Sequence, residues 1–420
     1  MNSSGSTRRL ALLLLAAHVL SMAGFATYSA LLAELRDLWK LSNAQSGLIG
    51  GLFFAGYIAS VSYAAALTDR VDPRRIYAAG SALCVAGCSG FGLFADGFVS
   101  AAFFQVLGGA GIAATYMPGL RLLSERISGP AQSRVVAFYT SFFGIGVAFS
   151  YALAGMLAPD MGWRTAFLVS AAGPLAAGLV VFFCVSPAPR HAVQAQAFSL
   201  SQLFPVAAWR RVLAVRAAAG YTLGYAVHCF ELLGAGAWTV AFLVFAASQH
   251  SPGASFPWTA AAIASAVSLL AVPASVLGNE VALRIGRRRW ILIVMSASGI
   301  GGIVLALCAP LAWPVVLGLL MIYTVLTMAE SATLTAGLVA SAPAELRGTA
   351  MGLYSLCGFS GGMLGPPVFG LVLDTAGGNA SVAAWGWAYA AIGAGCLAAP
   401  LAVRLVSGSG PRQPPASPGR

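Results

Sequence analysis

The feature that most constrains this chain is a series of apolar runs, each about as long as the roughly 20 residues that a helix needs to cross the hydrocarbon core of a bilayer. Only 8% of its residues are charged and 59% are hydrophobic, so a water-soluble fold of 420 residues would lack the charges to cover its surface. We therefore expect an all-α integral membrane protein with twelve transmembrane helices, at about residues 10–32, 46–67, 75–95, 98–120, 135–158, 164–186, 214–247, 257–282, 290–310, 313–340, 348–373 and 381–405.

The basic residues fall almost entirely on one side of this arrangement. Of the 23 lysines and arginines, the alternation of loops places only Arg36, Lys40 and Arg164 on one side and the other 20 on the opposite side. Because cytoplasmic loops are enriched in these residues, we expect both termini in the cytoplasm. The same bias accounts for the net charge of +11 without a nucleic-acid partner.

Short sequence patterns recur between two halves of the chain. The loop after the second run has Asp69 followed by arginines, and the loop after the eighth has Glu280 followed by arginines, 211 residues later. Arg134 and Arg347 open the fifth and eleventh runs in a similar way, 213 residues apart. This repeat predicts an N-terminal six-helix bundle, a cytoplasmic linker, a C-terminal six-helix bundle and a disordered tail, at residues 1–186, 187–213, 214–406 and 407–420.

With these features the sequence resembles the major facilitator superfamily of secondary transporters over nearly its whole length. The most specific motif of that family, Gly-x-x-x-Asp-Arg-x-Gly-Arg-Arg, is matched in the 2–3 loop by Asp69, Arg70, Arg74 and Arg75, whereas Ala65 replaces its first glycine. The general look is nearest to bacterial porters of the cyanate and nitrate type, which implies a location in a bacterial inner membrane. The resemblance implies two pseudo-symmetric bundles that rock about a central site.

The resemblance also implies a role for this motif. In the family it acts as a latch between helices, in which an acid at a helix end pairs with the arginines. We expect a gating latch of this kind at both copies of the motif, from Asp69, Arg70, Arg74, Arg75, Glu280 and Arg287.

Polar side chains at membrane depth are costly, so each marks a candidate functional position. Glu231 and Glu330 lie near the middle of the seventh and tenth runs, and His228 shares a helix face with Glu231 at i, i+3 spacing. A carboxyl group there must be paired, protonated or exposed to water, which suits proton coupling. The polar positions gather in runs one, four, seven and ten, which line the central cavity in the resembled family. The candidate substrate- or proton-binding residues are Glu231, Glu330, His228, His18, Gln105, Tyr28, Tyr225 and Tyr323.

The charge of these positions bears on the substrate. No arginine or lysine of the sequence falls at mid-membrane, although a small inorganic anion would normally be bound by a buried arginine fork. The residues favour a small organic solute, neutral or cationic, moved by alternating access with protons as the expected coupling ion. The alternatives are a cyanate- or nitrate-like anion porter, a drug or metabolite efflux pump and, outside transport, a membrane-embedded sensor. The sequence shows no convergent set of catalytic groups of the kind that an enzyme would need.

The cysteines and histidines do not form a metal-binding pattern. All seven cysteines lie in apolar runs, and none has the spacing of zinc ligands or of a disulfide framework. We therefore expect no cofactor and no metal. The expected partners are the lipid bilayer, a small-molecule substrate and the coupling proton, and we expect a monomer.

Overall fold

The structure is a computed structural model, and it describes residues 3–68, 70–126, 130–187, 205–250 and 256–407. These residues form helices and no strand. Nine helical segments are long and apolar enough to cross a membrane, and one of them, Phe138–Cys184, turns back at Gly162, where φ is +80°, so it makes two passes. With α1–α2 and α17, the described residues account for the twelve predicted transmembrane helices.

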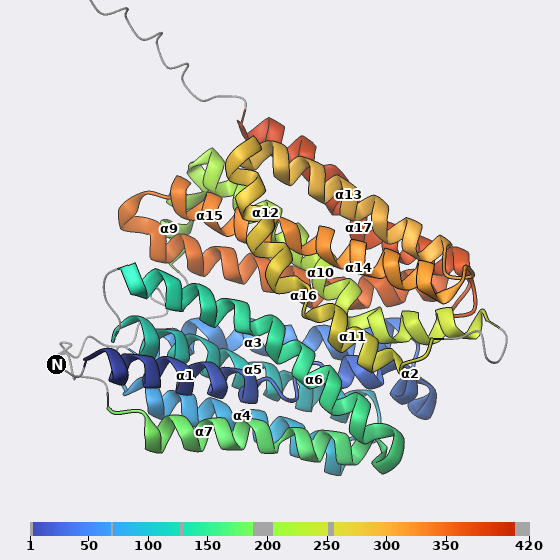
Figure 1. The fold of residues 1–420 in the computed structure, drawn as a ribbon, viewed down its shortest axis with the longest axis horizontal. Helices are drawn as coiled ribbons and strands as arrows, with labels where there is room; N and C mark the ends of the chain where they lie inside the picture. Colours follow the sequence, from blue (N-terminus) through green and yellow to red (C-terminus); the bar gives the residue numbers. More distant parts are fainter. Residues whose placement is uncertain (1–2, 69, 127–129, 188–204, 251–255, 408–420) are drawn as a thin grey trace, which may run out of the picture.

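The helices of each half of the chain lie together, those of the first half below and those of the second half above in Figure 1. The first half contains α1 (Ser3–Ser21), α2 (Thr27–Trp39), α3 (Asn43–Leu67), α4 (Pro73–Phe94), α5 (Phe98–Ser124), α6 (Pro130–Ser170) and α7 (Ala172–Cys184). The second contains α9 (Val206–Ala214), α10 (Arg216–Ser248), α11 (Ala260–Ser268), α12 (Ala271–Ile285), α13 (Arg287–Leu307), α14 (Trp313–Ala329), α15 (Ser331–Ser341), a 3-10 turn (Ala344–Leu346), α16 (Arg347–Thr375) and α17 (Val382–Ser407).

The predicted linker and tail fall largely outside the described residues. Of the linker at 187–213, residues 188–204 are not described, and the rest leads into the short helix α9. The tail is outside them from residue 408 onward. The division into two bundles at these residue numbers therefore stays a prediction.

Glycines allow helices to approach one another closely. Such close packing matters in lipid, because no hydrophobic force drives helices together there. A Cβ atom at Gly109 of α5 would lie 1.7 Å from the carbonyl oxygen of Phe53, and one at Gly47 of α3 would lie 2.2 Å from that of Pro366. The first contact holds α5 against α3 within the first half. The second belongs to a seam between α3 and α16 that joins the two halves.

Four of the predicted transmembrane helices are interrupted within their length. The first breaks between α1 and α2, the sixth at Ala171, between α6 and α7, the eighth between α11 and α12, and the tenth at Glu330, between α14 and α15. At the first break, Ser150 of α6 accepts a hydrogen bond from the Ala26 amide (2.9 Å) and donates one to the Ala23 carbonyl (2.7 Å). A neighbouring side chain thus replaces the hydrogen bonds that a helix break leaves open.

The two ends of the molecule differ in charge and in how the halves meet. We call the end that carries residues 70–75 and 286–289 the arginine-rich end, and the other the far end. Toward the far end the halves are joined by hydrogen bonds, for example from the Tyr151 hydroxyl to the Gly236 carbonyl (2.8 Å) and from Ser265 to the Ala148 carbonyl (2.8 Å). The far end is therefore closed.

Candidate functional site

A buried carboxylate–imidazole pair lies at the break in the tenth transmembrane helix. Glu330 occupies the break itself, and its Oε1 is 3.0 Å from Nδ1 of His228 on α10. Both side chains are almost completely buried, at 0% and 1% exposure. Oε2 of Glu330 has no hydrogen-bond partner among the described residues. One oxygen of this carboxyl group is thus held by the histidine, and the other is available to a proton or a water molecule.

Glu231 lies in a second polar cluster in the same half. Its Oε2 accepts a hydrogen bond from Ser298 of α13 (2.8 Å), and its Oε1 accepts one from the hydroxyl of Tyr323 on α14 (3.3 Å). Glu231 is 1% exposed, and each of its carboxyl oxygens has one of these hydroxyls as a hydrogen-bond partner. Tyr323 was among the predicted site residues, whereas Ser298 was not, because a lone serine in an apolar run is a weak polar signal.

His228 and Glu231 point to different neighbours, although their spacing suggested a direct pair. Three residues advance a helix by about 300°, so the two side chains diverge by about 60° and enter different gaps between helices. His228 bonds across to Glu330 on the tenth transmembrane helix, whereas Glu231 turns toward α13 and α14. The two carboxyl groups therefore sit in neighbouring clusters inside the second half.

The first half holds an aromatic cluster around His18. The imidazole of His18 stacks on Tyr139 of α6 at 4.4 Å between ring centroids and lies 5.3 Å from the ring of Tyr116 on α5. His18 is 2% exposed, and its Nε2 has no hydrogen-bond partner among the described residues. This nitrogen is therefore a buried polar atom within an aromatic cluster, and a role for it in binding stays a prediction.

Gln105 lies apart from the His18 cluster. It lines a cavity of about 20 Å³ together with Ser21, Cys84 and Phe53, which is room for about one water molecule. Gln105 is 7% exposed, and its side chain forms no hydrogen bond with a described residue. A water molecule in this cavity would satisfy its amide.

The two remaining tyrosines of the predicted set have different surroundings. The hydroxyl of Tyr28 donates to the Ser46 carbonyl at 2.9 Å, in the packed region between α2 and α3. Tyr225 stacks on Tyr354 of α16 at 3.8 Å and lies 5.8 Å from the His228 ring. Tyr225 therefore borders the carboxylate–imidazole pair, whereas the hydroxyl of Tyr28 is already used in packing.

The predicted latch of the first half is only partly described. Asp69 lies outside the described residues, and Arg70 and Arg75 are exposed. Arg74 pairs with Asp72 (2.8 Å), which sequence analysis did not count as a latch residue, and also donates to the Val185 carbonyl at the end of α7 (2.8 Å). Burial disfavours the charged form of Asp72, but the hydrogen bonds from Arg74 outweigh it and hold the pKa of this carboxyl below its usual value.

The copy of the motif in the second half is not paired in this conformation. Glu280 is exposed and forms no ion pair with a described residue, and Nε of Arg287 has no described partner. Latch formation by Glu280 and Arg287 in another conformation stays a prediction.

A clasp at the far end joins the halves through a carboxylate that sequence analysis did not single out. Asp374, near the end of α16, accepts hydrogen bonds from the Asn43 amide (3.0 Å), the Asn43 side chain (2.8 Å) and the Ala44 amide (2.9 Å). Arg36 in turn donates to the side-chain oxygen of Asn43 (3.2 Å). The carboxylate thus satisfies free amides at the N-terminus of α3, where the helix dipole also favours negative charge.

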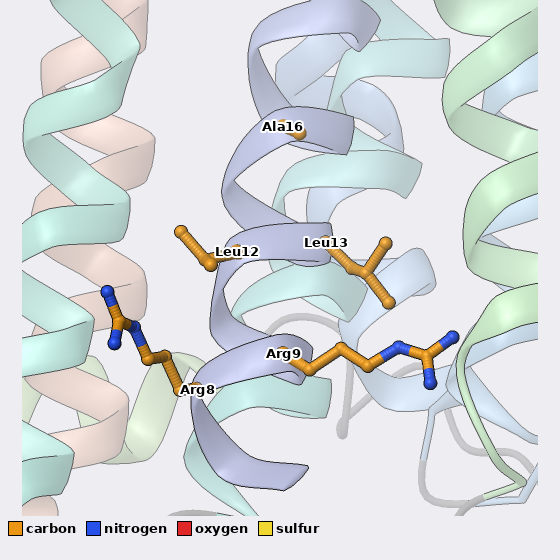
Figure 2. A pocket seen from close by; sticks show the side chains of 5 residues that line it. All are labelled: Arg8, Arg9, Leu12, Leu13 and Ala16. Carbon is orange, nitrogen blue, oxygen red and sulfur yellow. The ribbon is translucent and has the colours of Figure 1, made fainter. Parts of the chain in front are cut away.

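A hollow beside α1 at the arginine-rich end is not part of these clusters. It is lined by Leu12, Leu13, Ala16 and two arginines of the same helix, and Figure 2 shows the Arg8 and Arg9 side chains pointing away from each other. Both arginines are exposed. This arrangement is typical of basic residues at a membrane–water boundary.

Sequence comparison identifies the family. A profile of the Major Facilitator Superfamily matches residues 14–366. The chain belongs to this superfamily. Its members are membrane-spanning transporters. This agrees with the predicted fold class and membrane-spanning character, and with the prediction that the chain is a transporter and not an enzyme.

Named relatives within the superfamily carry small organic solutes. The chain is 26% identical to a gentisate transporter of Corynebacterium glutamicum over 88% of this chain and 82% of that one. It is 26% identical to the niacin transporter NiaP of Acinetobacter baylyi, but over only 31% of this chain and 30% of the relative. Matches to the first few curated relatives span only about a third of their length.

Solved structures share the fold at low sequence identity. A bacterial homologue of the human lysosomal transporter Spinster, in an inward-facing and occupied conformation, superposes with a TM-score of 0.77 at 17% identity, covering 97% of this chain and 99% of that one. The nucleoside transporter NupG gives 0.74 at 14% identity, with coverage of 94% and 99%. The chain therefore shares the fold of these transporters.

Proposed function

We propose that this protein is a proton-coupled transporter that works by alternating access, with Glu330 and His228 as its titratable centre. The observation that carries the proposal is their buried pair, in which one carboxyl oxygen is held at 3.0 Å and the other lacks a described partner. A carboxyl group that is closed off from water has its lowest free energy when it is neutral or paired. Exposure of the site to each side of the membrane in turn would let the proton enter on one side and leave on the other.

The substrate that the residues favour is a small organic solute without a net negative charge. Among the described residues, the mid-membrane side chains whose ordinary pKa allows a charge near neutral pH are carboxyl and imidazole groups, and the arginines lie toward the ends. An anion would have to approach two carboxyl groups without a fixed cation to balance it. The rings of Tyr116 and Tyr225 are only partly buried, and they are the aromatic surfaces that we propose for a planar solute.

The cyanate- or nitrate-like alternative receives no support from the two relatives named above, which are transporters of the organic molecules gentisate and niacin. We propose that the arginine-rich end faces the cytoplasm of a bacterial cell, that the protein works as a monomer, and that Tyr225, Tyr323, His18 and Gln105 contribute to the substrate or proton pathway.

Counterflow in proteoliposomes tests the transport function. The probes are nicotinamide and niacin, which differ in an amide against a carboxylate, together with gentisate and cis,cis-muconate. We expect counterflow of at least one probe and a preference for nicotinamide over niacin. Uptake of niacin without nicotinamide would contradict the charge argument, and flux without counterflow would indicate a channel.

A further inference from the structure

The break in the tenth transmembrane helix is held from two neighbouring helices. The carbonyl oxygen of Ala329, the last residue of α14, accepts a hydrogen bond from the indole nitrogen of Trp290 on α13 (3.1 Å). The amide of Ala332, at the start of α15, donates to Oγ of Ser275 on α12 (3.2 Å). These are backbone groups that a helix break leaves open, and both find side-chain partners outside their own helix.

The close fit of α12 against the break adds a steric constraint. A Cβ atom at Gly278 would lie 2.0 Å from the carbonyl oxygen of Ala329, so α12 touches the backbone at this point. Ser275 and Gly278 lie three residues apart and therefore on one face of α12. That face and Trp290 enclose the peptide groups on both sides of Glu330.

We infer that Ser275 and Trp290 are positioning residues that fix the break in the tenth transmembrane helix and thereby hold Glu330 against His228. This inference rests on the proposed function of Glu330. Trp290 directly follows the arginine cluster that opens α13, and Gly286, with φ at +94°, makes the turn between α12 and α13. The residues that flank the second copy of the sequence motif therefore make two contacts to the backbone on either side of Glu330, a role that differs from the latch expected of the motif.

Several titratable groups from surrounding helices interact electrostatically with Glu330, and they belong to α10, α16 and α17. They are His228, Glu231, Cys229, Tyr354 and Cys396. Because His228 is the one hydrogen-bonded to Glu330, a change in the backbone at the break acts first on this pair.

The test uses the purified full-length protein and the pH dependence of its melting temperature between about pH 5 and pH 8, which spans the ordinary range of histidine. Trp290→Phe removes the indole donor and keeps a ring, and Ser275→Ala removes the hydroxyl. The matched controls are Trp387→Phe, at an exposed tryptophan of α17, and Ser268→Ala, whose hydroxyl bonds only within α11. Each variant is also made in the Glu330→Gln background.

We expect Trp290→Phe and Ser275→Ala to move the midpoint of the pH profile by about half a pH unit or more, since one hydrogen bond is worth about 1 kcal/mol and a pH unit about 1.4. The shift should vanish in the Glu330→Gln background, and the controls should keep the wild-type profile. Equal shifts in both backgrounds would overturn the inference, because the two residues would then act on stability without acting through Glu330.

Failure of the proposed function gives a different result. If Glu330→Gln alone leaves the pH profile unchanged, Glu330 does not titrate in this range. The inference is then decided by the melting temperatures at a single pH. If the losses of melting temperature from Trp290→Phe and Glu330→Gln add up in the double variant, the two residues act independently and the positioning role is contradicted. If the losses do not add up, the positioning role is supported.

Discussion

At the scale of single residues, the polar groups inside the membrane are satisfied by specific partners, and this makes their removal measurable. Ser298 donates to Glu231 and also contacts the carbonyl of Met295 in its own helix at 3.1 Å. We expect Ser298→Ala to lower the free energy of unfolding by about 1–3 kcal/mol, because it leaves a buried carboxyl oxygen unsatisfied. Ser360→Ala is the control, since that hydroxyl bonds only to the Leu356 carbonyl of its own helix. Thermal unfolding in detergent measures the difference, and equal losses in both variants would contradict it.

Asp72 gives a residue-scale prediction about pH. Its pKa is below the ordinary value, so its contribution to stability is complete above about pH 4 and is lost as the pH falls through the lower folded-state value. Asp72→Ala should lower stability at neutral pH, by about 1 kcal/mol for a lost helix cap, and should flatten the acid limb of the stability curve. An acid limb as steep as that of the wild type would show that Asp72 does not contribute.

At the residue scale, the sequence identifies the candidate polar residues but does not identify their partners. The polarity of Glu231, Glu330 and His228 within apolar runs marks them as a functional set, and the structure buries all three. Which groups pair depends on the rotation of each helix and on its neighbours, so the bond from His228 to Glu330 could not be read from spacing along one helix.

At the scale of helices, the seam between α3 and α16 depends on backbone contact. A Cβ atom at Gly47 would lie 2.2 Å from the Pro366 carbonyl oxygen, whereas one at Gly50, on the same helix, would meet nothing closer than 3.7 Å. Gly47→Ala should therefore weaken closure of the far end and slow transport several-fold, while Gly50→Ala should behave as wild type. Transport rates in proteoliposomes compare the pair, and equal rates would mean that the seam tolerates a methyl group.

The positions of the transmembrane helices follow from apolar run length, and their boundaries agree with the predicted ranges to within a few residues for most of them. The breaks could not be predicted in the same way. The tenth helix is interrupted at Glu330 although no proline or glycine adjoins it, because Trp290 and Ser275, from other helices, stabilise the open backbone groups. Contacts of this kind depend on tertiary structure, which no local pattern encodes.

At the scale of the whole molecule, closure of the far end is held by the clasp between Asp374 and the start of α3. Asp374→Ala removes three hydrogen bonds between the halves and should shift the population toward a conformation open at the far end. Spin labels at Leu38 of α2 and Gln249 beside α10 lie on opposite halves at this end and are exposed. Their distance distribution should gain a longer component in the variant. An unchanged distribution would mean that the clasp does not limit opening.

The central claim is that the pair of Glu330 and His228 couples transport to protons, and accumulation driven by a pH gradient tests it most directly. The solute that shows the strongest counterflow is followed in proteoliposomes containing wild type, Glu330→Gln, or the control Glu345→Gln, at a carboxylate that is exposed. We expect Glu330→Gln to abolish accumulation while exchange of the solute persists, and Glu345→Gln to accumulate it as wild type does. Wild-type accumulation and pH dependence in Glu330→Gln would contradict the account.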